Sequence, residues 1–418
     1  MFGINSNYKY LVFQLSVIGL CILCSLVFKP LIFVVFAISV YTIRSQKDRN
    51  AFCQLFFILP FSMIYKLSPA SSSFFAYTLL YYAFYLIVHD KVRLDSVILL
   101  SVYLLLGSID SIETWAKLVS GFILLSFFVE HSNQRSIRDY VACFSVGLVM
   151  SSLIGFYIQD WPVLLSYYKE LNEELIGGEI IARFSGLYGD PNYYSISIIM
   201  VAYFLINFLI RNSINKIIFI PVTVILVYWG FLTYSKLYML SIFFVLATQL
   251  RSYFKTAKNK IIVIIFTFFV GAIALDKFLS SEYFVQFSSR VDTDNISTNR
   301  FYIWSEYLDY LGHNIYSLLF GVGFSSSFYK GIAPHNTYIE SLYFLGVFGT
   351  VIYCMTILKI FDLKRLIRIR TIDNYYILFI FLMMIGTLGV MTFNEIWLYF
   401  MLIWGALNID YRHQNCLA

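Results

Sequence analysis

Charged residues are scarce in this chain of 418 residues. Only 13% of the residues are Asp, Glu, Lys or Arg, whereas 60% are hydrophobic. A soluble domain could not cover its surface with so few charges, so the composition excludes a soluble enzyme and indicates a polytopic membrane protein. The formal net charge of +6 does not indicate nucleic-acid binding, because the basic residues form short clusters between apolar runs.

The chain also lacks cysteines in long polar loops, linkers between domains and a signal-peptide cleavage site, and each absence limits the domain organisation that can be expected. None of the six cysteines lies in a long polar loop, so no disulfide framework is expected. No linker or change of composition divides the chain, which predicts a single integral membrane domain over residues 1–418. No small-residue cleavage site follows the first apolar run, residues 11–28, so we expect an uncleaved first span.

Apolar runs of helical length recur through the whole chain. They occur near residues 11–28, 31–43, 51–65, 73–88, 95–108, 115–130, 140–158, 192–210, 217–234, 237–250, 261–279, 337–358, 374–392 and 396–408. A bilayer core is crossed by roughly 20 helical residues, and shorter runs can form tilted hairpins. The pattern predicts an all-α polytopic membrane bundle of about 12–14 transmembrane helices.

Most of the Lys and Arg residues lie in alternate loops, beginning with Arg44, Lys47 and Arg49. The positive-inside rule then places these loops and both termini in the cytoplasm. Two long polar loops, 159–191 and 280–336, fall on the opposite side. In a Gram-negative cell this side is the periplasm, so we expect an inner-membrane protein with both long loops periplasmic.

The first long loop ends in a sequence that suits an anion. Arg183 precedes Gly186, and Asp190-Pro191 leads into an apolar run. Asp is a favoured N-cap and Pro a favoured first helical residue, so a helix should begin here with its N–H groups facing outward. Arg183 beside such a helix end could bind an anionic group. Alternatively, Arg183 extends its guanidinium to lipid head groups.

The second long loop contains an amphipathic pattern. Arg300 and Trp304 are one turn apart and would share one face of a helix lying along the membrane interface. Anchoring by Trp304 and nearby tyrosines is the simplest role for this helix.

His335 follows Pro334, and only Asn336 separates it from the apolar run 337–358, so it lies at or beside the N-cap of a helix. A helix N-terminus disfavours the imidazolium form, so a neutral His335 could accept a proton. The alternative is a purely structural hydrogen bond. Glu340 should lie roughly 7.5 Å further along the same helix, where a carboxylate is costly unless it is paired. Gly346 and Gly349, one turn apart on this helix, would permit close helix packing beneath the site.

The second half of the chain carries a series of short motifs. They are His335-Asn336 followed by Gly346 and Gly349-Thr350, Arg183-Phe-Ser-Gly186 leading to Pro191-Asn192, Asn299-Arg300 through Trp304, Gly321-Val-Gly323, and Thr233-Tyr-Ser235-Lys236. In order and spacing they resemble the motifs of the bacterial O-antigen ligase and polymerase superfamily. In the last motif Lys stands where that group has Arg. The resemblance covers roughly residues 180–400 and does not extend clearly to the N-terminal third.

The resemblance implies a metal-independent, inverting glycosyltransferase with no cofactor. Its donor would be an oligosaccharide on undecaprenyl diphosphate at the periplasmic face of the inner membrane. It implies Arg183 and Arg300 as diphosphate ligands with Arg290 as a weaker third, and His335 as the general base or the group that orients the acceptor. Asn192, Asn336 and Glu340 are expected to bind substrate. A separate co-polymerase that sets chain length is the expected protein partner, besides the lipid bilayer.

Two activities fit these motifs, and a third class of protein remains open. A polymerase would join lipid-linked repeat units, and a ligase would transfer finished polymer to lipid A core. The abundance of Phe, Tyr, Ile, Asn and Lys favours the polymerase. A transporter of lipid-linked glycan would place its polar groups near the middle of the membrane instead. Asp292-Thr-Asp294 has the Asp-x-Asp pattern of metal-dependent glycosyltransferases, although such carboxylates are usually solvated charges.

Overall fold

The computed structural model describes residues 6–45, 48–68, 72–95, 97–106, 112–158, 173–176, 179–188, 190–210, 214–256, 300–324, 327–362, 386 and 397–405. Its elements before the first long loop are α1 (Ser6–Ser25), α2 (Leu31–Ser45), α3 (Asp48–Ile58), the 3-10 turn η1 (Leu59–Phe61), α4 (Phe74–Val88), α5 (Ile98–Leu106), α6 (Ile112–His131) and α7 (Gln134–Ile158). The remaining elements are β1 (Glu173–Ile176), β2 (Glu179–Ala182), α9 (Pro191–Ile210), α10 (Lys216–Phe231), α11 (Lys236–Thr256), α14 (Arg300–His313), α15 (Ile315–Phe320), η3 (Tyr329–Gly331) and α16 (Thr337–Ile360).

The described part of the chain is helical apart from one antiparallel hairpin, β1–β2, which pairs Glu173 with Ala182. Four of its helices are long and apolar enough to cross a membrane, namely Ile112–His131, Arg135–Tyr157, Pro191–Leu209 and Thr337–Ile360. Shorter apolar helices accompany them. The predicted α-helical class is therefore confirmed. The run predicted at 261–279, and the run at 374–392 except for residue 386, lie outside the described residues, so the total of about 12–14 spans stays a prediction.

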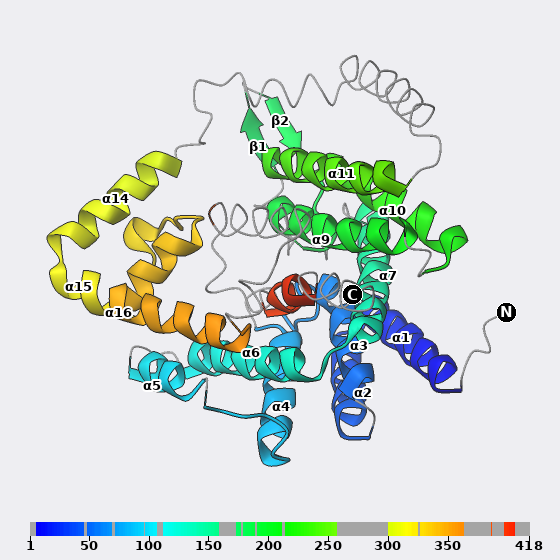
Figure 1. Cartoon of the computed structure of the whole chain (residues 1–418), viewed down its shortest axis with the longest axis horizontal. Helices are drawn as coiled ribbons and strands as arrows, with labels where there is room; N and C mark the ends of the chain where they lie inside the picture. The colour runs from blue at the N-terminus through cyan, green and yellow to red at the C-terminus, as the bar shows by residue number, and fades with distance from the viewer. Residues whose placement is uncertain are drawn as a thin grey trace.

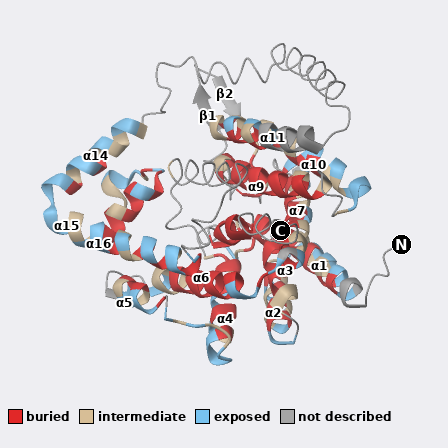
Figure 2. Cartoon of the chain, in the orientation of Figure 1, coloured by how far each residue is buried: buried red, intermediate tan, exposed pale blue. Residues whose placement is uncertain are grey.

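The core lies where α3, α6, α7 and α9 pack around the buried segment 397–405 (Figures 1 and 2). The Trp397 ring contacts Phe122 of α6, with 4.3 Å between ring centroids, and the Tyr399 hydroxyl lies 2.6 Å from Ser197 Oγ of α9. Gly121 of α6 makes room for this segment, because a Cβ there would come within 1.9 Å of the indole nitrogen of Trp397. The C-terminal apolar run is thus packed against helices of the N-terminal half of the chain.

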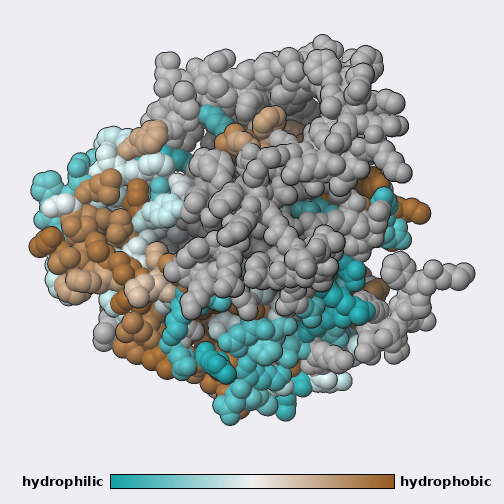
Figure 3. Space-filling view, viewed as in Figure 1, coloured by the Kyte–Doolittle hydropathy of each residue, from teal (hydrophilic) through white to brown (hydrophobic). Residues whose placement is uncertain are grey.

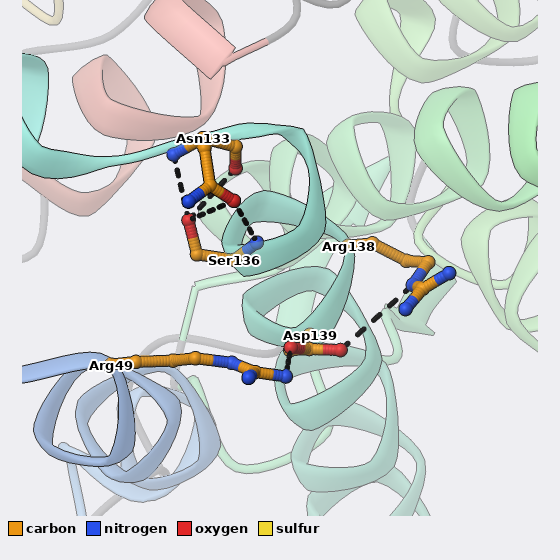
Figure 4. A network of polar contacts seen from close by, with 5 residues as sticks. All are labelled: Arg49, Asn133, Ser136, Arg138 and Asp139. Carbon is orange, nitrogen blue, oxygen red and sulfur yellow. Dashed lines mark hydrogen bonds and ion pairs between the residues drawn. The ribbon is translucent and has the colours of Figure 1, made fainter. Parts of the chain in front are cut away.

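Helix α7 begins with a reciprocal cap, shown in Figure 4. The Asn133 amide donates to Ser136 Oγ, and the Ser136 amide donates to Asn133 Oδ1, which satisfies N–H groups that a helix start leaves unpaired. One turn later Asp139 forms an ion pair with Arg49 at the start of α3, and Arg138 lies close to the same carboxylate (Figure 4). These contacts join loops that the charge pattern assigns to one side of the membrane.

Loops assigned to the opposite side also meet one another. Ser72 donates to the carboxylate of Glu113, and Lys117 Nζ lies 2.6 Å from the same carboxylate and 3.2 Å from Ser72 Oγ. Ser72 belongs to the short loop 66–72 and Glu113 to the short loop 109–114, and Lys117 lies one turn further along α6. The structure thus groups these loops as the alternation of charge predicts, and the assignment of either side to the cytoplasm stays a prediction.

Helices α14, α15 and α16 form an arm at one side of the molecule, yellow to orange in Figure 1. A small core of its own fills the angle between α14 and α16, made of Tyr307, Leu311, Ile339, Tyr343 and Phe344. The Trp304 side chain also points inward, because its indole N–H donates to the Pro334 carbonyl at 2.8 Å. The expectation that Trp304 and the nearby tyrosines anchor α14 to the membrane interface stays a prediction.

Helix α16 is not continuous. At Gly346 the backbone adopts φ 66° and ψ −177°, which breaks the helix between the turns that carry Gly346 and Gly349. The expectation that both glycines lie on one regular helix is thus wrong. The sequence could not show this, because two glycines one turn apart also occur where straight helices pack closely.

Candidate functional site

Arg183 is buried, with 8% of its side-chain surface exposed, and it connects three segments of the chain. Its Nε donates to the Thr233 carbonyl and its Nη2 donates to Asn192 Oδ1, both at 3.0 Å. The next residue, Phe184, donates its amide to the Leu232 carbonyl. Arg183 is therefore held by the protein, so the alternative that it extends freely to head groups does not describe this structure.

The turn that Arg183 contacts is the Thr233-Tyr-Ser235-Lys236 motif. Thr233 Oγ1 donates to the Gly230 carbonyl and accepts from the Ser235 amide, so this side chain closes the turn between α10 and α11. Tyr234 takes a positive φ of 49° at the tip. Two motifs that lie far apart in the sequence thus form one unit around the guanidinium of Arg183.

The predicted start of α9 is confirmed. Asp190 Oδ1 accepts from the amides of Asn192 at 2.6 Å and Tyr193 at 3.4 Å, and Pro191 is the first helical residue. Because Asn192 also accepts from Arg183, the helix end and the arginine lie side by side. This arrangement directs the positive end of the helix dipole toward the loop face.

Gly186 serves packing rather than ligand approach. It adopts a positive φ of 56°, and a Cβ there would lie 3.0 Å from the Tyr194 ring. A Cβ on Gly155 of α7 would lie 2.7 Å from the Gly186 carbonyl. The two glycines let α7 and the 183–190 loop touch, so the space beside Gly186 is filled by protein. Gly189 lies outside the described residues.

His335 has an unusual backbone conformation. Its φ is 47°, in the left-handed region that costs most non-glycine residues about 1–2 kcal/mol. The neighbours on both sides are fixed: the Pro334 carbonyl accepts from Trp304, and Asn336 caps α16 by accepting from the amides of Tyr338 and Ile339. Asn336, rather than His335, is thus the N-cap, and the strain falls on the histidine. Such strain is concentrated at functional positions in proteins.

Two charged residues act on the His335 imidazole, one from each long loop. Its ring keeps access to solvent, yet burial by the surrounding protein lowers the pKa of His335 below its ordinary value. The Arg300 guanidinium, at the first residue of α14, lowers this pKa further, whereas the Asp190 carboxylate acts in the opposite direction. The neutral imidazole is therefore favoured, as the position before a helix suggested.

The structure thus brings together most of the residues that the sequence singled out. Arg183, Asn192 and Asp190 form one hydrogen-bonded group, and the Asp190 carboxylate and Arg300 both lie within electrostatic range of His335. Asn336 lies next to His335 as the cap. Arg290 lies outside the described residues.

Glu340 is buried in the first turn of α16, with 2% of its surface exposed. Its charge acts on the Tyr307 hydroxyl of α14, whose pKa is raised mainly by burial and also by this carboxylate. Tyr307 in turn donates to the Ile332 carbonyl and accepts from the Tyr329 amide. Glu340 therefore lies beside the small core that contains Tyr307, in the first helical turn after His335.

The break at Gly346 has its own set of hydrogen bonds. A helix that ends leaves its last carbonyls unpaired. The Tyr343 carbonyl accepts from the Val322 amide at 2.8 Å, and the Phe344 carbonyl accepts from the Gly323 amide at 3.1 Å. The Gly321-Val-Gly323 motif thus binds the open end of the first part of α16, rather than forming a flexible turn.

Tyr103 of α5 completes this arrangement. Its hydroxyl donates to the Leu345 carbonyl at 2.6 Å and lies 3.1 Å from the Phe320 carbonyl, while its ring packs against Gly349. Sequence reasoning missed Tyr103, because an isolated tyrosine in an apolar helix carries no local signal. It also missed that the Asp190 carboxylate raises the pKa of His335, because only the capping role of Asp190 is visible in the sequence.

No family model, curated protein or solved structure that we compared with the chain matches it. Within the described residues, no three His, Cys, Asp or Glu side chains lie together as a metal site would require. The Asp292-Thr-Asp294 sequence lies outside those residues. The site is therefore defined by its own geometry: two arginines, one strained histidine and one carboxylate.

Removing either of the two charges that act on His335 should shift the pKa of its imidazole, in opposite directions for the two charges. Asp190→Asn keeps an oxygen that can cap α9 but removes the negative charge, so the pKa of His335 should fall. Arg300→Gln removes a positive charge, so the same pKa should rise. The rate at which diethyl pyrocarbonate modifies His335, followed by mass spectrometry against pH, reports the neutral imidazole. Shifts in the same direction for both variants would contradict this description of the site.

Proposed function

We propose that this protein is a polysaccharide polymerase of the O-antigen type, which joins undecaprenyl-diphosphate-linked oligosaccharide repeats at the periplasmic face of the inner membrane. The observation that carries the proposal is the position of His335. It has a strained backbone and lies within electrostatic range of Arg300 and Asp190, and Asn192 links Asp190 to Arg183. A neutral base near one arginine, linked through Asp190 and Asn192 to a second arginine, supplies the groups that inverting glycosyl transfer from a diphosphate would use.

In the proposed reaction, a hydroxyl of the acceptor repeat attacks the anomeric carbon of the donor sugar. The new glycosidic bond forms as the bond to the lipid diphosphate breaks, and the configuration at that carbon inverts. His335 accepts the proton of the attacking hydroxyl. Negative charge grows on the departing diphosphate, and the guanidinium groups of Arg183 and Arg300 stabilise it. We expect Arg290 to contribute as a third cation, and Asn192, Asn336 and Glu340 to contact the sugars.

Burial makes Arg183 effective in this role. Two hydrogen bonds, to the Thr233 carbonyl and to Asn192 Oδ1, orient its guanidinium. A cation that is already oriented loses little freedom when the transition state forms, which is the basis of electrostatic preorganisation. Arg300, at the first residue of α14, is supported on a regular element rather than on a loop.

The ligase is the main alternative, because the same chemistry would transfer finished polymer to lipid A core. A lipopolysaccharide gel from a strain that lacks this chain separates the possibilities. Loss of a polymerase should leave core capped by a single repeat, and loss of a ligase should leave long polymer on the undecaprenyl lipid. A transporter would instead leave unpolymerised repeats on the cytoplasmic side. An unchanged ladder of chain lengths would contradict the proposal.

A further inference from the structure

The helical pair α14–α15 exposes an apolar stripe that its own small core does not use. Along α14 the side chains of Phe301 and Leu308 are 68% and 53% exposed, and Ile315 and Tyr316 at the start of α15 are 65% and 72% exposed. Phe301 and Leu308 are seven residues apart and therefore lie on one side of the helix. Soluble surfaces rarely carry so many adjacent large apolar side chains, so this stripe is expected to contact something apolar.

Helix α14 has three distinct sides. Tyr307 and Leu311 face the small core against α16, and the apolar stripe forms the second side. The third side carries Glu306, Asp309 and His313 together with Tyr302, and all of these except Glu306 are exposed. Helices with this division lie in a membrane interface, with the stripe among acyl chains and the charged side in water.

The stripe is continuous with the membrane-spanning surface of α16. The Tyr316 ring contacts Phe320 with 5.1 Å between ring centroids, and Phe320 contacts Phe348 at 5.5 Å. Phe348 is exposed on α16, on the same side as the exposed Val351 and Met355. Figure 3 shows hydrophobic residues gathered over α15, α16 and α5 at the edge of the molecule. The surface of a span that faces acyl chains thus continues onto α15 and α14, where the exposed Ser305 lies between Phe301 and Leu308.

We infer that α14–α15 is embedded in the outer leaflet, with Phe301, Leu308, Ile315 and Tyr316 among the acyl chains and the side of Asp309 and His313 toward water. The occupant of this surface is the lipid bilayer. The exposed charged residues of α14 include acidic ones, so the attraction is burial of apolar side chains and not recognition of anionic head groups. The part of the predicted large loop that contains α14 is therefore not a solvated segment.

The embedding has a consequence for the arm. The amides of Val322 and Gly323 bind carbonyls at the break in α16, so α14–α15 cannot slide along α16 without losing these hydrogen bonds. The depth of α14 in the leaflet then sets the depth of its first residue, Arg300. This inference concerns the membrane position of the arm and does not depend on the proposed function.

Adjacent residues of α14 and α15 provide matched test positions. In a variant without the six native cysteines, single substitutions Leu308→Cys, Asp309→Cys, His313→Cys and Ile315→Cys would each carry a nitroxide label, with Val351→Cys as a lipid-facing reference. The protein is placed in nanodiscs of phosphatidylethanolamine with or without phosphatidylglycerol. Collision rates are measured with oxygen, which concentrates in lipid, and with a water-soluble nickel chelate.

We expect labels at 308 and 315 to resemble the label at 351, with oxygen collisions several-fold more frequent than nickel collisions. Labels at 309 and 313 should show the opposite preference, and the phosphatidylglycerol content should change neither pattern. High nickel access at 308 and 315 would overturn the inference. Low access of both reagents there would also overturn it, because a protein partner would then cover the stripe. Phe301→Cys and Tyr316→Cys supply a second pair of positions if a first variant fails to fold.

Discussion

Replacing Gly346 with alanine should lower the thermal stability of the protein. The loss should be larger than for any other substitution in α16 that adds a single methyl group. The backbone at Gly346 has φ 66° and ψ −177°, a region that is essentially restricted to glycine. A Cβ there would also lie 2.4 Å from the Gly321 amide nitrogen and 2.5 Å from the Leu319 carbonyl oxygen. Both neighbours are backbone atoms, so they cannot rotate away. Strain and overpacking together should cost roughly 2–6 kcal/mol.

Alanine substitutions at two other glycines distinguish backbone strain from steric overlap as the cause of the lost stability. Gly331 also has a positive φ, of 72°, but a Cβ there meets nothing within 4 Å, so Gly331→Ala should show the backbone strain alone. Gly312 lies in α14 with open space around it, so Gly312→Ala should be neutral or slightly stabilising. Apparent melting temperatures in detergent, followed by size-exclusion chromatography after heating, would rank the three. Equal values for the 346 and 312 variants would show that α16 is not broken in solution.

The hydroxyl of Tyr103 gives a milder test of the same break. Tyr103→Phe keeps the ring that packs on Gly349 but leaves the Leu345 carbonyl without its donor at 2.6 Å. An unsatisfied buried carbonyl costs about 1–3 kcal/mol. The same substitution at the exposed Tyr316 removes no hydrogen bond that supports the break, so it serves as the matched control.

The helical class and several local features could be predicted from the sequence because they depend on neighbouring residues. Long apolar runs determine spanning helices, and Asp190-Pro191 starts a helix wherever the segment lies. The break at Gly346 could not be predicted, because it depends on partners from other parts of the chain. Gly321 fills the space beside it, and Tyr103 from α5 supplies a donor.

The same division holds for the site. Chemical type and position before a helix pointed to His335, Arg183 and Arg300. What the sequence could not show is which groups face each of them. Two nitrogens of Arg183 donate hydrogen bonds to Thr233 and Asn192. The negative charge that acts on His335 is the carboxylate of Asp190, which caps a different helix, α9. Such pairings depend on how α9 and α16 are placed, and no pattern within either segment encodes that placement.

The second large effect is expected at His335 itself. His335→Asn is the informative substitution, since asparagine tolerates the left-handed backbone that alanine would strain. It removes the base while leaving the Asn336 cap in place. Loss of a general base lowers rates by roughly 10²–10⁴-fold. Membranes that contain this variant should therefore fail to extend lipid-linked repeats into long chains, although the protein is folded and present in normal amount.

A repeated pair in the chain provides the control for this experiment. His313-Asn314 has the same two residues as His335-Asn336, but His313 is exposed at the end of α14 and its ring contacts the Asp309 carbonyl. His313→Asn should therefore leave polymerisation unchanged. A normal ladder of chain lengths from the His335→Asn variant would remove the histidine from the chemistry.

Substitutions of the two arginines, measured in the same polymerisation assay, test whether their charge alone or also their orientation is needed. Arg300→Ala should lose long-chain product by roughly 10²–10³-fold, as expected when a group that stabilises developing charge is removed. Arg183→Lys keeps the charge but cannot reproduce the two hydrogen bonds to Thr233 and Asn192, so it should also fail if orientation matters. Full activity of Arg183→Lys would show that only a positive charge is needed there. Full activity of Arg300→Ala as well would leave the diphosphate without the ligands proposed here, and the assignment of this loop face as the catalytic site would then be wrong.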